Sequence, residues 1–284
     1  MIRLRRSALY LPASNPRAIA KARDAACDIV ILDLEDAVAP EHKVPARAAA
    51  VAAEREGGFG TRTLVVRINA LASEWGADDL AVVGDAGFDA ILLPKIDGPD
   101  DIHRYAAAIG GNAELWAMIE TCRSVFALPA IAACARDVAL TTFVMGTNDL
   151  AKDMRAPLTP DRAPFLGFLA QAVAAARIHG LTVLDGVFNA IDDDAGLVAA
   201  CAQSVAFGFD GRTLIHPSQI AACNAAFTPS AQDVAKAQAI VAAFALPENA
   251  GKGALRVAGA MVERLHLDQA RMTLTLYHAC CAQR

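Results

Sequence analysis

The 284-residue chain lacks the long apolar runs that mark a membrane or secreted protein. The apolar stretch from Val125 to Ala135 is interrupted by Pro129, far short of the ~18 residues that a membrane-spanning helix needs. Behind the basic N-terminus, the stretch Ser7–Leu11 is shorter than the ~7–15 residues of a secretory signal core. We therefore expect no membrane association and no secretion.

The chain also lacks an excess of basic residues and a cysteine framework. Lys and Arg number 26 against 31 Asp and Glu, a net charge of −5, which argues against nucleic acid as a partner. The seven cysteines are an odd, scattered set without paired metal-ligand spacing. Such cysteines are typical of reduced thiols, so we expect a cytoplasmic protein without disulfides.

Hydrophobic residues make up 55% of the chain, enough for a large core, and they follow a repeated α/β pattern. Short β-rich runs alternate with Ala-rich segments of helical spacing, which predicts βαβ units and a parallel sheet. The predicted strands are Ser7–Leu11, Asp28–Leu34, Thr63–Asn69, Ala90–Ile96, Glu114–Glu120, Leu140–Gly146, Thr182–Phe188 and Arg212–His216. Candidate helices between them include Asn15–Ala26, Lys43–Glu56, Pro99–Ile109, Ser124–Ala135, Pro164–His179, Asp193–Val205 and Ser218–Phe227.

Eight strands, each with a following helix, predict a closed (β/α)8 TIM barrel. The alternative is an open doubly wound sheet, which usually carries a glycine-rich turn after its first strand. The first turn here, residues 12–16, contains no glycine, which favours the barrel.

The alternation stops after Phe227, which divides the chain into a barrel domain, residues 1–227, and a C-terminal helical extension or lid, residues 228–284. Thr228-Pro229-Ser230 is typical of a helix start and predicts a helix over 231–244. Residues 247–253 form a Gly- and Pro-containing break, and residues 255–277 are predicted to be mostly helical.

Polar residues gather at the predicted strand ends, where the active sites of such barrels lie. Glu120 and Asp149 follow adjacent strands, and carboxylates without a Cys/His cluster suit Mg²⁺, with Mn²⁺ as the alternative. Arg67 offers a planar fork for a substrate carboxylate. Asn69, Lys95 and Glu120, also at strand ends, are further predicted substrate contacts. The pattern indicates a metal-assisted site for an anionic, oxygen-rich small molecule.

Other interpretations of these residues stay open at the level of sequence. Asp149 stands at a predicted helix start and is also compatible with a role in helix capping alone. Asp33 is compatible with orienting the metal ligands or with an ion pair to Lys95. Lys95 is also a candidate for Schiff-base chemistry, and Cys122 is a candidate thiol nucleophile. His216 is also compatible with a purely structural role, as a turn histidine whose ring nitrogens are hydrogen-bonded.

Several motifs in one register along the chain carry a family resemblance. They are LYLPASNP (9–16), DIVILDLEDAVAPEHKVPAR (28–47), VVRIN (65–69), ILLPKI (91–96), IET (119–121), GTNDLAKDM (146–154), HGLTVLDGVF (179–188), GFDGRTLIHPSQI (208–220) and GKGALRVAGAMVE (251–263). With them the chain resembles the citrate lyase β-subunit-like group of the HpcH/HpaI aldolase superfamily, which includes citryl-CoA, malyl-CoA and citramalyl-CoA lyases.

The resemblance implies a barrel that forms a homotrimer or hexamer and binds Mg²⁺ through Glu120 and Asp149. It implies that Arg67 binds the carboxylate of a 2-oxo acid and that Glu35 and Asp36 support the metal's waters. It further implies that a tail segment covers a neighbouring subunit's site and delivers an acid, here Glu263, where relatives have aspartate.

The predicted activity is Mg²⁺-dependent carbon–carbon cleavage, or formation, of a 3-hydroxyacyl-CoA thioester, giving an acyl-CoA and a 2-oxo acid. Arg67 and Glu263 are its predicted catalytic residues. The alternatives are an aldolase for free 4-hydroxy-2-oxo acids, a citrate lyase β subunit acting on acyl carrier protein, and a noncatalytic regulator that binds a metal and an oxo acid.

Overall fold

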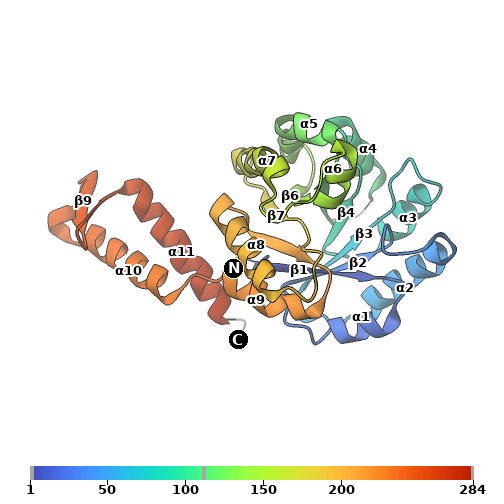
Figure 1. Ribbon diagram of the computed structural model, residues 1–284, viewed down its shortest axis with the longest axis horizontal. Helices are drawn as coiled ribbons and strands as arrows, with labels where there is room; N and C mark the ends of the chain where they lie inside the picture. Colours follow the sequence, from blue (N-terminus) through green and yellow to red (C-terminus); the bar gives the residue numbers. More distant parts are fainter. Residues whose placement is uncertain (1–2, 111–112, 283–284) are drawn as a thin grey trace. The chain divides into compact units, whose positions relative to one another are not determined.

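The computed structural model describes residues 3–110 and 113–282, and its centre is a closed barrel of eight parallel strands (Figure 1). The strands are β1 (Ser7–Pro12), β2 (Ile29–Asp33), β3 (Thr63–Arg67), β4 (Ala90–Leu93), β5 (Glu114–Ile119), β6 (Leu140–Met145), β7 (Thr182–Asp185) and β8 (Gly211–Leu214). Each strand pairs in parallel with the next, and β8 pairs with β1, so the sheet has no free edge. The predicted TIM barrel is confirmed.

Alternation along the strands fills the barrel interior with apolar side chains. Inward-facing residues from seven strands form one buried cluster: Ala8, Ile29, Ile31, Val65, Ala90, Leu92, Trp116, Met118, Val144 and Leu184. The residues between them face the helices and are also buried, as in β2, where every residue from Ile29 to Asp33 is inaccessible. Burial on both faces explains why these strands read as continuous apolar runs.

Helices surround the barrel and connect successive strands (Figure 1). They are α1 (Pro16–Ala22), α2 (Lys43–Glu56), α3 (Gly76–Val83), α4 (Pro99–Ala108), α5 (Cys122–Ala133), α6 (Thr147–Met154), α7 (Leu166–Ile178), α8 (Asp194–Phe207) and α9 (Ile220–Ala226), with short 3-10 turns at Pro40–His42, Cys134–Arg136, Ala163–Phe165 and Pro217–Gln219. The helices α3 and α6, of eight residues each, are not among the candidate helices that the sequence pattern singles out.

Capping residues set where several of these helices begin. Asn15 accepts a hydrogen bond from the Ala18 backbone N–H at 3.1 Å, and Pro16 occupies the first helical position of α1. Thr121 and Ser124 form a reciprocal capping box at the start of α5, directly after β5. These caps fix the direction in which the chain leaves the barrel mouth.

The chain divides into two compact units, one spanning Arg5–Asn224 and the other containing the segment from Ala225 onwards. The second unit holds α10 (Ala231–Ala245), a turn at Pro247–Asn249, a hairpin of β9 (Ala254–Val257) and β10 (Ala260–Glu263), and α11 (Arg264–Ala282). A capping box of Ser230 and Asp233 begins α10, in agreement with the predicted helix start.

The prediction of a mostly helical segment over 255–277 is wrong for its first nine residues, which form most of the hairpin. Ala258 and Gly259 have φ angles of +49° and +85°, a two-residue turn that suits tight antiparallel pairing. Val262 turns inward and packs with Ile240 of α10 and Leu267 of α11. The short apolar run is compatible with either structure, and tertiary packing selects the hairpin.

All seven cysteines are free thiols, as expected from their spacing. Within the part of the chain that the structure describes, no helix combines the length and apolar character required to cross a bilayer.

Candidate active site

The residues at the barrel mouth continue the inward-facing rows of the core. On β2, Asp33 follows Ile29 and Ile31 in the same alternation, and on β3 Arg67 follows Val65. Glu120 follows Trp116 and Met118 of β5 in the same way. The strands therefore aim three charged side chains into the space above the apolar core, at the carboxyl ends where barrel enzymes bind their substrates.

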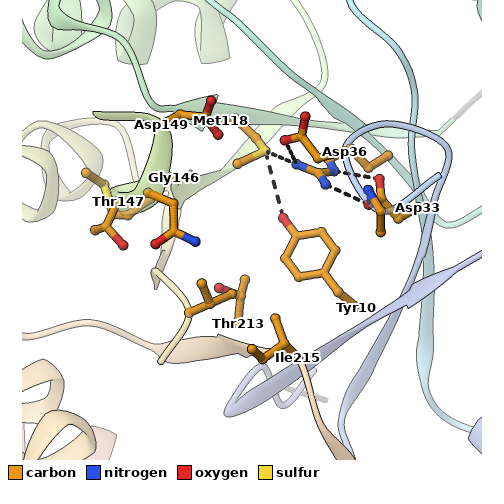
Figure 2. Close-up of a pocket in the computed structure, with 14 residues that line it drawn as sticks. Tyr10, Asp33, Asp36, Met118, Gly146, Thr147, Asp149, Thr213 and Ile215 are labelled. Carbon is orange, nitrogen blue, oxygen red and sulfur yellow. Dashed lines mark hydrogen bonds and ion pairs between the residues drawn. The ribbon is translucent and has the colours of Figure 1, made fainter. Parts of the chain in front are cut away.

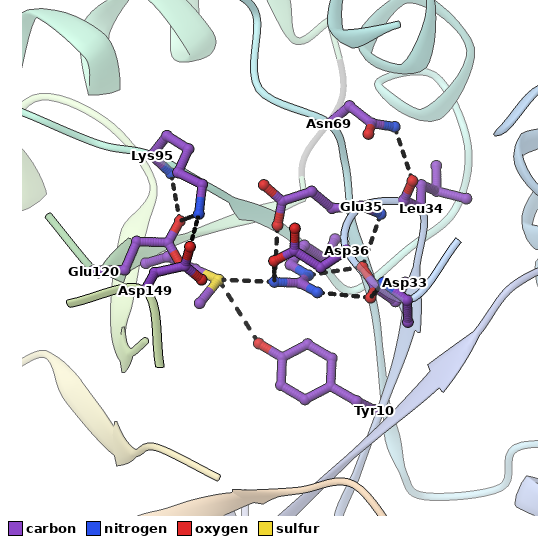
Figure 3. Close-up of polar contacts among 12 residues, drawn as sticks. Tyr10, Asp33, Leu34, Glu35, Asp36, Asn69, Lys95, Glu120 and Asp149 are labelled. Atoms are coloured by element: carbon purple, nitrogen blue, oxygen red, sulfur yellow. Dashed lines mark hydrogen bonds and ion pairs between the residues drawn. The ribbon is translucent and has the colours of Figure 1, made fainter. Parts of the chain in front are cut away.

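Arg67 is buried and held by several acidic groups (Figure 3). Its Nε donates to Asp33 Oδ1 at 2.7 Å and its Nη2 to Asp33 Oδ2 at 2.6 Å. Its Nη1 lies 2.8 Å from Glu35 Oε2 and 3.5 Å from Asp36 Oδ2. Burial by itself raises the pKa of Asp33, but the charge and hydrogen bonds of Arg67 outweigh it and hold that pKa below its usual value.

This pairing answers one question that the sequence left open. Asp33 pairs with Arg67, and both of its oxygens also accept backbone N–H groups, from Glu35 at 2.9 Å and Ala37 at 3.1 Å. One edge of the Arg67 guanidinium is thus taken by Asp33, and the edge at Nη1 faces the other carboxylates. A substrate carboxylate that binds Arg67 therefore meets it at the Nη1 end.

The loop that carries Glu35 and Asp36 is fixed from below by Lys43 and Asn69. The Lys43 ammonium donates to the carbonyls of Leu34 and Glu35 at 2.9 and 2.7 Å and to Asn69 Oδ1 at 2.8 Å. The Asn69 amide nitrogen donates to Leu34 O at 2.9 Å and to a buried carboxylate, Asp79, at 2.6 Å. The structure thus gives Asn69 a supporting position under this loop; a direct contact between Asn69 and substrate stays a prediction.

Glu120 and Asp149 converge on a single cationic group, the Lys95 ammonium. Lys95 Nζ lies 2.7 Å from Asp149 Oδ1 and 3.2 Å from Glu120 Oε1 (Figure 3). The Lys95 backbone N–H also donates to Glu120 Oε1 at 2.8 Å. Asp149 stands in the first turn of α6, and its contact with Lys95 means that helix capping is not its only task.

The surroundings of Glu120 suit a divalent cation. Glu120 is fully buried, and its Oε2 has no hydrogen-bond partner among the described residues. Burial raises the pKa of Glu120, and the neighbouring Lys95 acts in the opposite direction. The described residues contain no group of three or more His, Cys, Asp or Glu side chains placed to hold a metal, and Glu120 and Asp149 together offer two carboxylates. Mg²⁺ is commonly bound by one or two carboxylates together with substrate and water, and these residues fit it.

Glu35 shares this electrostatic environment. Burial raises its pKa to about 8, Arg67 opposes that change, and the nearby Glu120 carboxylate adds to it. Several carboxylates crowded in one buried place favour the arrival of further positive charge.

A cavity of about 290 Å³ opens beside these groups (Figure 2). Asp33, Asp36, Arg67 and Asp149 supply its charged wall. The rest of its lining is mainly apolar or hydroxyl-bearing: Tyr10, Ala37, Met118, Met145, Gly146, Thr147, Asn148, Val187, Thr213 and Ile215. A charged wall facing an apolar wall suits a small acid that carries a less polar substituent.

Reasoning from sequence missed Tyr10 and Met118 as parts of this site. The Tyr10 ring stacks on the Arg67 guanidinium at 5.0 Å, and its hydroxyl contacts Met118 Sδ at 3.8 Å. Met118 Sδ also lies 3.7 Å from Arg67 Nη1. Their positions in the sequence could have indicated them, because each residue lies on the inward-facing side of its strand, near the carboxyl end.

The structure shows the local surroundings of His216, Glu263 and Lys95. His216 accepts the Ser218 backbone N–H and contacts its hydroxyl at 2.7 Å, the arrangement of a satisfied turn histidine. Glu263 lies at the end of β10 in the second unit, where its backbone N–H donates to His266 Nδ1 at 2.9 Å. Its role as acid or base stays a prediction. The ion pairs of Lys95 hold its pKa above the usual value although burial lowers it, which disfavours the neutral amine that a Schiff base requires.

A closed parallel barrel with an arginine–aspartate pair and a lysine–carboxylate cluster at its mouth has the architecture of a TIM-barrel enzyme with a charged site at the strand ends. The HpcH/HpaI aldolase/citrate lyase family matches residues 6–217, and the chain belongs to this family.

Two named kinds of protein are among the relatives similar to this chain. The (3S)-malyl-CoA thioesterase of Cereibacter sphaeroides is 44% identical over 279 residues, covering 98% of this chain and 96% of the relative. The citrate lyase subunit beta of Escherichia coli K12 is 30% identical over 283 residues, covering 96% of this chain and 93% of the relative. Among solved structures, CitE of Mycobacterium tuberculosis in complex with magnesium, acetoacetate and coenzyme A is 29% identical with a TM-score of 0.81, covering 96% and 97% of the two chains. The chain therefore belongs to a family of enzymes whose named members here are a thioesterase and a lyase subunit.

Proposed function

We propose that this chain is a Mg²⁺-dependent carbon–carbon lyase that acts on a 3-hydroxyacyl-CoA thioester, with malyl-CoA first among the citryl-, malyl- and citramalyl-CoA candidates. The observation that carries the proposal is the juxtaposition of Glu120 and Asp149, a cation site, with Arg67, an anion site, at one barrel mouth. Support comes from the similar CitE, whose structure contains magnesium, acetoacetate and coenzyme A, and from relatives named for malyl-CoA.

Each charged group has a task in this reaction. Arg67 binds the carboxylate of the part that leaves as the 2-oxo acid, and Asp33 keeps the guanidinium oriented. Held by Glu120 and Asp149, Mg²⁺ would supply Lewis-acid polarisation of the substrate oxygen that becomes the keto oxygen. Glu35 and Asp36 contact Arg67 Nη1, and in this proposal their carboxylates would accept hydrogen bonds from water bound to the metal.

The reaction needs one proton to leave and one to arrive. The hydroxyl proton passes to a base, the carbon–carbon bond breaks, and its electron pair moves to the acyl-CoA part as an enolate. An acid then protonates the enolate carbon. We assign this acid to Glu263, delivered from a neighbouring subunit of a homotrimer or hexamer, as the family resemblance implies.

Hydrolysis of the same thioester is the second candidate, favoured by the 44% identity to (3S)-malyl-CoA thioesterases. Water then attacks the thioester carbonyl, and malate and free CoA are the products. Arg67 and the carboxylate pair would hold the malyl group in either reaction, so the site's binding groups do not separate the two.

A product analysis separates them. The purified protein is incubated with Mg²⁺ and malyl-, citramalyl- or citryl-CoA, or with a free 4-hydroxy-2-oxo acid, and all products are identified by mass. From malyl-CoA the proposal predicts acetyl-CoA and glyoxylate. Malate with free CoA would instead establish hydrolysis, and turnover of only the free acid would establish an aldolase.

Two further outcomes cover the remaining alternatives. Activity that requires copurified partners and an acyl carrier protein thioester would identify a citrate lyase β subunit. Binding of Mg²⁺ and an oxo acid without turnover of any substrate would identify a regulator. Glu120→Gln serves as the matched control, because it removes one carboxylate and preserves the shape of the side chain.

A further inference from the structure

Lys95 stands where the two proposed metal ligands meet. Its Nζ lies 2.7 Å from Asp149 Oδ1 and 3.2 Å from Glu120 Oε1, so one ammonium contacts both carboxylates (Figure 3). Glu120 is fully buried, and the Lys95 side chain is 35% exposed. A charge of −2 in this position is therefore already partly compensated by a residue of the chain itself.

We propose that the Lys95 ammonium is the resident counter-ion of the Glu120–Asp149 pair, which a divalent cation must displace, and that Lys95 thereby sets the affinity for the metal. The proposal rests on the proposed function, because it takes Glu120 and Asp149 as the metal ligands.

The two cations are not compatible in one place. Mg²⁺ binds oxygen at ~2.0–2.1 Å and requires an almost ideal octahedron of oxygen ligands, to which an ammonium contributes none. An ammonium that stayed against the same two oxygens would also lie within a few ångströms of a doubly charged ion, at a strong Coulomb cost. The lysine must therefore move away when the metal binds.

The backbone at Lys95 allows the side chain to leave without releasing Glu120. Lys95 has a φ of +52°, in the left-handed region that a side-chain-bearing residue rarely adopts. In this conformation its backbone N–H donates to Glu120 Oε1 at 2.8 Å. One residue thus supplies a hydrogen bond from its backbone and a charge from its side chain; the Nζ is buried against the carboxylates, while the side chain as a whole is 35% exposed.

Displacement also accounts for the predicted contact between Lys95 and substrate. In this structure the ammonium contacts carboxylates of the chain itself. The cavity beside it is lined by Thr121, Lys152, Asp153 and Arg155 as well as by Lys95 and the carboxylate pair. Once displaced, the ammonium would remain at the barrel mouth, where a substrate anion could pair with it.

The test measures Mg²⁺ binding and thermal stability, and needs no turnover. Mg²⁺ is titrated into the chelator-treated full-length protein by calorimetry, for the wild type and for Lys95→Met, Lys95→Arg and Lys152→Met. Lys152→Met is the matched control, because it removes one positive charge from the same cavity without touching the carboxylate pair.

For Lys95→Met we expect Mg²⁺ to bind about threefold to tenfold more tightly, since no internal cation competes. We also expect its melting temperature without metal to fall, because two carboxylates lose their counter-ion, and the increase on adding Mg²⁺ to exceed that of the wild type. Lys95→Arg and Lys152→Met should stay near the wild type in Mg²⁺ affinity.

An unchanged or weaker Mg²⁺ affinity in Lys95→Met would overturn the inference. Asp149→Asn separates this failure from a failure of the proposed function. If Mg²⁺ binds the wild type and Asp149→Asn abolishes binding, the metal site stands and only the role of Lys95 fails. If Asp149→Asn leaves Mg²⁺ binding intact, the assignment of the metal ligands fails, and the inference with it.

Discussion

Arg67 and Asp33 form a two-point ion pair at the barrel mouth, with Nε–Oδ1 and Nη2–Oδ2 distances of 2.7 and 2.6 Å. The pair joins the ends of β2 and β3, two neighbouring strands in register at these very residues. It fixes the plane of the guanidinium and leaves the Nη1 end toward the cavity. Asp33 thus sets the orientation of the Arg67 guanidinium.

Asp33→Asn should reduce kcat/KM by about 10²-fold, because a small displacement of Arg67 misaligns the bound carboxylate. It should also lower the free energy of unfolding by about 3 kcal/mol, because a buried guanidinium loses its main partner. Steady-state kinetics and urea denaturation measure the two effects. Glu56→Gln is the control: its side chain is 67% exposed and lies 2.7 Å from Arg23 in a surface ion pair, so both values should change little. Equal effects of the two variants would contradict the assigned role of Asp33.

The same pair predicts a pH dependence of stability. Arg67 holds the pKa of Asp33 below its ordinary value against the effect of burial, so the folded protein binds the proton less readily than the unfolded chain. The stabilisation is therefore complete above the unfolded pKa of ~3.9 and is lost as the pH falls through the lower folded pKa. Urea denaturation from pH 7 to pH 2 should show the wild type and Asp33→Asn differing at neutral pH and converging in acid. A difference that is constant across this range would argue against the shift.

Glu120→Gln and Asp149→Asn should each abolish the dependence of turnover on Mg²⁺ and lower kcat/KM by at least about 10²-fold. The unfolding free energy of Glu120→Gln should not fall, because burial already raises the pKa of this carboxyl and the amide carries no charge. Kinetics with and without chelator, together with urea denaturation, check both statements. Asp153→Asn, an exposed carboxylate four residues after Asp149 on α6, should keep the Mg²⁺ response. Turnover near the wild-type level in Glu120→Gln would remove it from the metal site.

Gly146→Ala should disturb the site by steric overlap, without changing any charge. A Cβ at position 146 would lie 2.4 Å from Glu120 Cβ and 2.6 Å from Glu120 Oε2, so Glu120 or its strand must shift. We expect a loss of about 1–3 kcal/mol in unfolding free energy and a weakening of Mg²⁺ binding by about tenfold or more. Gly98→Ala is the matched control, since nothing lies within 4 Å of a Cβ there. Normal Mg²⁺ affinity in Gly146→Ala would mean that Glu120 does not need this space.

The barrel was predictable because its signal is local and repeated. Strands buried on both faces appear as continuous apolar runs, and eight such runs with helices between them leave few topologies. The hairpin of β9 and β10 was not predictable in this way. Its apolar residues are compatible with a helix, and the packing of Val262 against α10 and α11 selects the strands.

Within the site, residue type and strand position were enough to single out Arg67, Lys95, Glu120 and Asp149. The partners of these residues were not evident, because pairing depends on which side chains meet across strands that are far apart in sequence. Asp33 was considered as a partner of Lys95, yet it pairs with Arg67, and Lys95 pairs with Glu120 and Asp149. Asn69 is engaged below the site by Lys43 and Asp79.

The sequence alone determined the fold class and the chemical inventory of the barrel mouth: carboxylates, one arginine and one lysine after apolar strands. The tertiary structure decided how these charges pair, which edge of Arg67 faces the cavity, and that Lys95 stands between the two proposed metal ligands. The physical reason is the distance along the chain over which each pattern acts. The hydrophobic pattern of a strand or helix involves residues that are close in sequence. Ion pairing at the mouth depends on distances of a few ångströms between side chains of different strands, which come together only when the barrel closes.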